Sequence, residues 1–181
     1  MFWEVETIRQ LIFCLESNSK AKIDWIYIKE VVDSFFTYGN YIKFSPVYMG
    51  GKTNYKRDKT IKEIKSLTNT IRGESIVIYC IDADLIESDP DRRREFDEIK
   101  AYCSNEGYEF IWFHRNVEDV FLGRMVEQSE KIREAERFKR QALIKNVNLG
   151  KLRSRTETAS QSSNIITILK KYLKTKEDMV I

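Results

Sequence analysis

The chain has 181 residues and a mass of 21.5 kDa, enough for one domain with a substantial hydrophobic core. Hydrophobic residues make up 42% and charged residues 33%, with only two prolines and seven glycines, which excludes a disordered chain, a collagen-like repeat and a loop-rich secreted scaffold. The formal net charge is only +3, so the chain as a whole is neither strongly basic nor strongly acidic.

No stretch of the sequence approaches the roughly 20 apolar residues that a membrane span requires. Near the N-terminus, Glu4 and Arg9 interrupt any apolar core of a signal peptide. The cysteines Cys14, Cys80 and Cys103 are odd in number, far apart and set in apolar or helical patterns, which favours buried thiols over disulfides or metal ligands. We therefore expect a cytoplasmic protein that does not contact a membrane.

The first predicted elements alternate between helix and strand. Apolar residues recur at helical spacing over residues 2–15 and predict an N-terminal helix that packs on the core. Residues 23–28 (IDWIYI) are rich in β-branched and aromatic side chains and predict a first strand, with a short helix over 31–36. Residues 41–48 predict a second strand, which stops at Gly50-Gly51 because positive φ angles are accessible to glycine.

The central part of the chain carries the clearest patterns. Residues 54–71 have the spacing of an amphipathic helix, and residues 75–81 are almost continuously apolar, as in a parallel strand buried on both faces. A helix over 92–106 and a strand over 108–114 follow. This alternation predicts an α/β fold with an open, mostly parallel sheet flanked by helices, of the Rossmann type.

The last third of the sequence predicts a helical extension. Residues 117–144 have a helical pattern, residues 151–163 form a polar Ser/Thr-rich loop, and residues 164–174 predict a closing helix. The predicted division of the chain is an N-terminal helix over 1–22, an α/β core over 23–123 and a basic helical C-terminal region over 124–181.

Acidic side chains follow three of the predicted strands. Asp82 and Asp84 end the most apolar strand, Glu30 follows residues 23–28, and Glu118 comes soon after the last strand. Ligand sites in open α/β sheets form at the carboxyl ends of strands. The i, i+2 spacing of the two aspartates directs both side chains to one side, where a cation would relieve their repulsion. Carboxylate oxygens suit Mg²⁺ or Mn²⁺, whereas zinc prefers His or Cys and the chain has one His.

A structural explanation of the acidic segment stays open beside the metal site. In that alternative, Asp84 and Asp89 cap the helix that begins near Asp91 and bind no ion. The run Arg92-Arg93-Arg94 is expected to pair mainly with neighbouring acidic residues.

Basic residues concentrate in the C-terminal third. Residues 124–156 contain ten Lys or Arg against four Glu, which is typical either of a surface for a polyanion or of a solvated helix face. The predicted nucleic-acid contacts are Lys52, in the Gly-Gly-Lys turn, together with Arg137, Lys139, Arg140, Lys151 and Arg153.

Four short segments resemble the TOPRIM fold, shared by topoisomerases, bacterial primases and the overcoming-lysogenization-defect (OLD) and RloB-like nucleases. They are residues 28–33 (IKEVVD), 50–54 (GGKTN), 82–84 (DAD) and 116–122 (NVEDVFL), and the resemblance covers roughly residues 23–123. The family has a glycine after its first-strand glutamate, where this sequence has Val31.

The resemblance implies roles for the acidic residues. Asp82 and Asp84 would bind Mg²⁺ (or Mn²⁺), Glu118 would be a further ligand, and Glu30 would act as general acid/base or hold a second ion. The implied activity is metal-dependent cleavage of DNA or RNA in bacterial phage defence or a mobile element, with a separately encoded ATPase partner and a homodimer as expected associations.

Two other functions remain open at this point. A non-catalytic nucleic-acid or protein-binding module on a degenerate TOPRIM scaffold is favoured by Val31 in place of glycine. A phosphotransferase of haloacid-dehalogenase type, with Asp82 as the nucleophile, is disfavoured because Ile86 stands where that family has Thr or Val.

Overall fold

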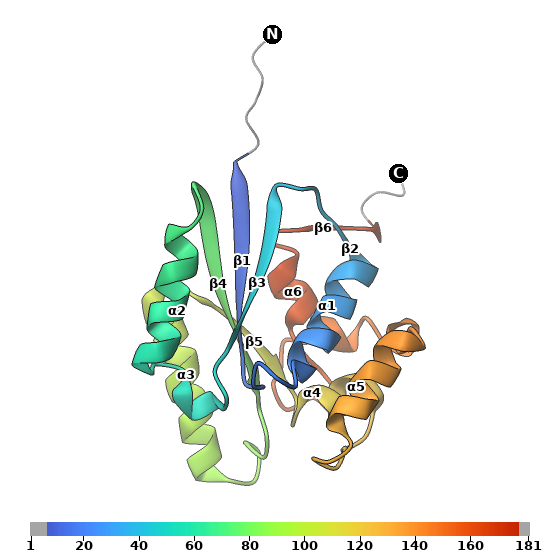
Figure 1. Cartoon of the computed structure of the whole chain (residues 1–181). Coiled ribbons are helices and arrows are strands. Elements are labelled where there is room, and N and C mark those ends of the chain that lie inside the picture. Colours follow the sequence, from blue (N-terminus) through green and yellow to red (C-terminus); the bar gives the residue numbers. More distant parts are fainter. Residues whose placement is uncertain (1–6, 178–181) are drawn as a thin grey trace.

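A four-stranded parallel sheet forms the centre of the protein, in a computed structural model that describes residues 7–177 (Figure 1). The strands lie in the order β3-β1-β4-β5, and each neighbouring pair is parallel. They span Ile8–Leu15 (β1), Ile42–Tyr48 (β3), Gly73–Asp82 (β4) and Glu109–Phe113 (β5). The predicted fold class, an open parallel sheet flanked by helices, is confirmed.

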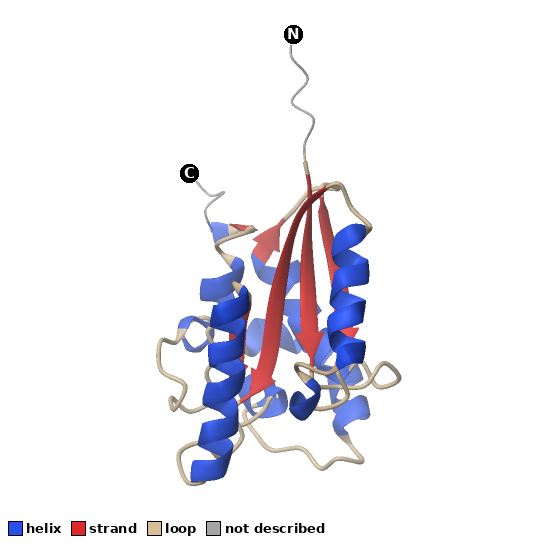
Figure 2. Cartoon of the chain, turned by 90° about the vertical axis from the view of Figure 1, so that its left-hand side faces the viewer, coloured by secondary structure: helices blue, strands red, loops and turns tan. Residues whose placement is uncertain are grey.

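Helices cover both faces of the sheet (Figure 2). One face carries α2 (Asp58–Asn69) and α3 (Pro90–Glu106). The other carries α1 (Ile23–Phe35), α4 (Val117–Leu122), α5 (Lys131–Arg140) and α6 (Ile165–Leu169). The smaller elements are the antiparallel pair β2 (Phe36–Thr37) and β6 (Lys174–Thr175) and the 3-10 turns η1 (Lys52–Asn54), η2 (Leu143–Asn146) and η3 (Lys151–Arg153).

The predicted N-terminal helix is wrong, because residues 8–15 form strand β1 in the middle of the sheet. Every residue from Leu11 to Leu15 is fully buried, since helices pack on both faces of this strand. A strand buried on both sides has a continuous apolar sequence, and such a short run also satisfies helical spacing. Residues 2–6 of the predicted helix lie outside the described residues. Within the predicted helical unit over 1–22, residues 8–15 form a central strand and residues 16–22 form the loop that leads to α1.

The predicted strand over residues 23–28 is also wrong, because this segment forms the first half of helix α1. Ile23, Tyr27, Ile28 and Val31 are buried, and their spacing of four, one and three residues places them on one face of a helix. Burial of this face against the sheet outweighs the β propensity of the individual side chains.

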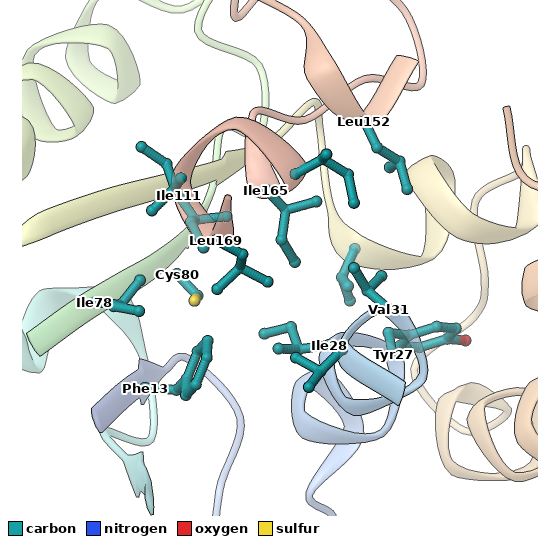
Figure 3. Close-up of a cluster of buried hydrophobic side chains, with 14 of the residues drawn as sticks. Phe13, Tyr27, Ile28, Val31, Ile78, Cys80, Ile111, Leu152, Ile165 and Leu169 are labelled. Carbon is teal, nitrogen blue, oxygen red and sulfur yellow. The ribbon is translucent and has the colours of Figure 1, made fainter. Parts of the chain in front are cut away.

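The C-terminal region belongs to the same hydrophobic core as the sheet (Figure 3). Leu152, Ile165 and Leu169 are fully buried and face side chains of the sheet and of α1. In the polar loop, the Ser163 hydroxyl donates a hydrogen bond of 2.6 Å to the carbonyl oxygen of Trp112 in β5. The long predicted helix over 117–144 is divided into α4 and α5.

Two further predictions concern the cysteines and the absence of a membrane-spanning segment. The three cysteines are buried and free, which confirms the prediction of buried thiols. Across residues 7–177, none of the helices combines the length and apolar character that crossing a bilayer requires.

Candidate acidic site

Four carboxylates line one cavity of about 340 Å³ at the carboxyl edge of the sheet, the lower edge in Figure 1. Glu16 directly follows β1, and Asp82 is the last residue of β4. Asp24 lies in the first turn of α1, and Glu118 lies in the first turn of α4. Four segments far apart in the sequence thus contribute one acid each to what we call the acidic cavity.

Backbone hydrogen bonds fix three of these carboxylates. Glu16 Oε1 accepts a hydrogen bond of 2.7 Å from the backbone N–H of Asp82, which ties the end of β1 to the end of β4. Asp24 Oδ2 accepts from the N–H of Ser17 at 2.8 Å, and Asp82 Oδ1 accepts from the N–H of Val117 at 3.1 Å. The acids are therefore held by the same loops that leave the strands.

Burial and mutual repulsion make it unfavourable for all the carboxyl groups of the acidic cavity to be ionised together. Burial raises the pKa of Glu16 to about 8, and the charges of Asp24 and Asp84 act in the same direction. Burial also raises the pKa of Asp82 well above its usual range, with the charge of Glu16 as the next cause. The pKa of Asp24 is raised as well, first by burial and then by the nearby Glu118. Such a cluster favours protons or a cation.

Two lysines supply positive charge at the site. Lys131 Nζ donates to Glu118 Oε2 at 3.2 Å, while Glu118 Oε1 is buried and has no hydrogen-bond partner. Lys52 Nζ donates to the backbone oxygen of Asp82 at 3.2 Å and to the carboxylate of Asp84. Burial alone would lower the pKa of both ammonium groups, but the adjacent carboxylates raise it, so both lysines stay charged.

The donor set fits a hard divalent cation, because it consists of carboxylate oxygens and includes the unpartnered oxygen of Glu118. Within residues 7–177, however, no three acidic, His or Cys side chains are grouped closely enough to hold an ion. Binding would require these side chains to move toward one another, and the predicted Mg²⁺ or Mn²⁺ stays a prediction.

Glu30 does not reach the acidic cavity. It lies in the second half of α1, about 9 Å along the helix axis from Asp24. The positive charge that acts most on it is that of Lys139, which lowers its pKa against the stronger effect of burial. The carboxylate at the end of the first strand is Glu16, which directly follows β1 in a segment whose apolar spacing had predicted a helix. The continuous apolar run of residues 11–15 was the signal that could have identified this strand and its final acid.

Asp82 and Asp84 do not point the same way. Asp82 faces the acidic cavity, whereas Asp84 lines a neighbouring cavity and pairs with Lys52 and, at 3.3 Å, with Arg92. The strand ends at Asp82, and Asp84 has a left-handed φ of 48°, so strand alternation no longer applies to it. The expectation that both aspartates face one ion is not met in this arrangement.

The capping alternative holds for Asp89 and not for Asp84. Asp89 accepts hydrogen bonds from the backbone N–H groups of Asp91 at 3.0 Å and Arg92 at 3.2 Å, at the start of α3. The arginines of the following run pair with acidic neighbours, as expected, and Arg92 also reaches Asp84.

We expect Asp89→Ala to lower the free energy of unfolding by about 1 kcal/mol, because it removes an N-cap. In a thermal melt this corresponds to a decrease of about 2–4 °C in Tm. Asp89→Asn is the matched control, because an Asn side chain caps a helix about as well as Asp does, and it should melt within about 1 °C of the wild type. An equal loss of Tm in both variants would show that the loss does not come from the cap.

The predicted nucleic-acid contacts are spread over several elements. Lys52 is 9% exposed and already engaged with Asp84, so it is not an open surface lysine. Arg137 pairs with Glu134 at 2.7 Å, and Arg153 pairs with Glu177 at 2.6 Å. The remaining predicted contacts are Lys139 and Arg140, at the end of α5, and Lys151, which donates to Gln161 at 2.9 Å. Their binding to nucleic acid stays a prediction.

No protein-family model matches the chain, and no curated protein sequence matches it.

Proposed function

We propose that the protein is a Mg²⁺-dependent nuclease that cleaves phosphodiester bonds of DNA or RNA, with Mn²⁺ as an alternative ion. The observation that carries this proposal is the acidic cavity, in which four carboxylates from separate segments meet at the carboxyl edge of a parallel sheet. This edge is where open α/β sheets bind their ligands.

Asp82, Glu118 and Glu16 are the residues that would hold the ion. When bound, Mg²⁺ would polarise a phosphoryl oxygen and make an attacking water more acidic. Glu118 Oε1 is buried without a partner, and Asp82 and Glu16 resist ionisation in this environment, so all three carboxylates favour a cation nearby.

The chain's own groups are suited to proton transfer and phosphate binding. Because burial raises the pKa of Glu16 to about 8, this carboxyl group can take up or release a proton near neutral pH. Gly50 and Gly51 line the cavity with φ angles of 69° and 124°, so backbone lies at its wall without side chains that would obstruct a phosphate.

In the proposed TOPRIM-like site, the acid in the place of the family's first glutamate is Glu16, because Glu30 lies within helix α1. The family's glutamate ends the first strand, and Glu16 directly follows β1, with Ser17 at the position of the family's glycine. Asp82 ends a later strand, and Glu118 follows the last one. The resemblance extends the proposal to a cytoplasmic protein of phage defence or a mobile element, with a separate ATPase partner and self-association as a homodimer.

The test is cleavage of plasmid, single-stranded DNA and tRNA by the purified protein with Mg²⁺, with Mn²⁺ and with EDTA. We expect cleavage with either ion and none with EDTA. An Asp82→Asn variant purified in the same way must be inactive, because an equally active variant would point to a contaminating nuclease. Undiminished cleavage in EDTA would refute the proposed mechanism.

A second candidate is a non-catalytic nucleic-acid-binding module. It is favoured by the pairing of Lys131 with Glu118 and of Lys52 with Asp84, which already neutralises part of the acidic charge. It is also favoured by the absence of a preformed three-ligand group within residues 7–177. Salt-sensitive nucleic-acid binding that is unaffected by Asp82→Asn, with no cleavage in either metal, would support this candidate.

A further inference from the structure

A second cavity, of about 360 Å³, lies next to the acidic cavity and differs from it in chemistry. The two cavities draw on the same two loops. Asp82 and Glu118 line the acidic cavity, whereas Asp84 and Asn116 line the second one. The Cα atoms of Asp82 and Asp84 are at most about 7 Å apart, because only Ala83 lies between them. One strand of nucleic acid, which rises about 3.4 Å per nucleotide, can therefore reach both cavities with neighbouring nucleotides.

The second cavity has an arginine with no partner in the described structure. Arg115 lines it, is exposed, and makes no side-chain hydrogen bond or ion pair with residues 7–177. Its backbone has a left-handed φ of 57°, and its carbonyl oxygen accepts a hydrogen bond of 2.7 Å from the N–H of Asp84. Arg92, which also lines the cavity, is shared between Asp84 and Asp89 at 3.3 Å each. Arg115 is thus the guanidinium free to bind an anion.

Apolar side chains form the rest of the wall. Leu85 is 48% exposed and Met125 is 56% exposed, and both line this cavity. They are two of the five large hydrophobic side chains that are exposed within residues 7–177. A cavity that combines a free guanidinium with an apolar wall matches a nucleotide, which has an anionic phosphate and an apolar base face.

We propose that this second cavity binds one unpaired nucleotide of the substrate strand, with its phosphate on Arg115 and its base against Leu85 and Met125. The inference rests on the proposed function, since it names the kind of strand that the acidic cavity acts on. A base held in a duplex is stacked and paired and does not project into a side cavity, so the cavity selects single-stranded or locally opened DNA or RNA.

The test is binding without cleavage, measured in EDTA by fluorescence anisotropy. The probes are a short fluorescein-labelled oligothymidylate, the matching oligouridylate, and a hairpin duplex of equal charge. We expect the single strands to bind at least about fivefold more tightly than the hairpin. Arg115→Gln is expected to weaken single-strand binding about tenfold and to reduce its salt dependence by about one ion. Arg94→Gln is the matched control, because it removes the same charge from an exposed position outside the cavity, and a change of less than about twofold is expected.

A second readout does not depend on either variant. In protein with ¹³C-labelled methionine methyl groups, saturation with oligothymidylate is expected to shift the Met125 signal, with the buried Met49 methyl as the reference. Leu85→Asp, at an exposed position, should weaken binding as Arg115→Gln does. An unmoved Met125 signal at saturation, equal effects of Arg115→Gln and Arg94→Gln, or no binding of any strand would overturn the inference.

The binding test and the nuclease test can fail independently of each other. Single-strand binding at Met125 without metal-dependent cleavage would support the cavity and refute the nuclease. Metal-dependent cleavage with preferred binding of the hairpin and an unmoved Met125 signal would support the nuclease and refute the cavity.

Discussion

Glu16→Gln is expected to lower Mg²⁺-dependent cleavage by about 100-fold or more, whereas Glu30→Gln is expected to change it by less than about twofold. The expected loss follows from the position of Glu16 in the acidic cavity, where it can act as an acid/base group or as a ligand. Glu30 lies further along α1 and does not line the cavity, so its substitution removes no group from the site. The measurement is the initial rate of cleavage at saturating metal.

A third variant and thermal melts make this comparison interpretable. Glu98→Gln, at an exposed position of α3, reports the effect of changing one surface charge. Thermal melts of all three variants establish that each is folded at the assay temperature. If Glu30→Gln lost activity and Glu16→Gln retained it, the assignment made from the sequence would be right and the one made from the cavity would be wrong.

The sequence pointed to Glu30, and not to Glu16, because of one error in assigning secondary structure. Residues 8–15 and residues 23–35 are both apolar and short of turn residues, and periodicity over so few residues does not separate a buried strand from a buried helix. Assigning the first segment as a helix and the second as a strand moved the end of the first strand from Glu16 to Glu30, whereas the next strands of the parallel sheet were assigned correctly. Strands β4 and β5 were predicted correctly, because they are bounded by charged loops and by Gly107.

The difference between correctly and wrongly assigned segments also explains which residues of the site could be predicted. Asp82 and Glu118 follow correctly assigned strands, and the topology of a parallel sheet is enough to bring them to one edge. Asp24 and Lys131 have no local signal, because their role depends on how α1 and α5 pack beside the sheet. The turn of Asp84 away from Asp82 depends on a left-handed backbone that an aspartate adopts infrequently. Tertiary packing and backbone conformation therefore determine which acidic side chains enter the cavity, and the spacing of residues in the sequence does not.

Lys52→Met is expected to lower the free energy of unfolding by about 2–4 kcal/mol near pH 8, because it leaves buried carboxylates without their cation. The Lys52 side chain is only 10% exposed, its ammonium group contacts Asp84, and its charge lowers the pKa of Glu16. The corresponding decrease in Tm is about 5–15 °C for a domain of this size. Lys62→Met, at an exposed position of α2, is the control for loss of one lysine and should melt within about 2 °C of the wild type.

The loss of stability should depend on pH in a direction that the pKa of Glu16 determines. This pKa is about 8 in the folded protein against 4.5 for the free side chain, so the folded state retains its proton more strongly than the unfolded state. The stability that this proton provides is fully present below about pH 4.5 and is lost as the pH rises through about 8. Without Lys52 the pKa of Glu16 rises further, so the loss of stability caused by Lys52→Met should be larger at about pH 9, where only the folded wild type has ionised Glu16, than at about pH 6, where both folded proteins keep this proton. Combining Lys52→Met with Glu16→Gln should restore part of the loss at about pH 9, because the two side chains interact directly. Equal losses at both pH values, with no recovery in the double variant, would mean that Lys52 stabilises the fold through the packing of its alkyl chain and that charge balance in the acidic cavity plays no part.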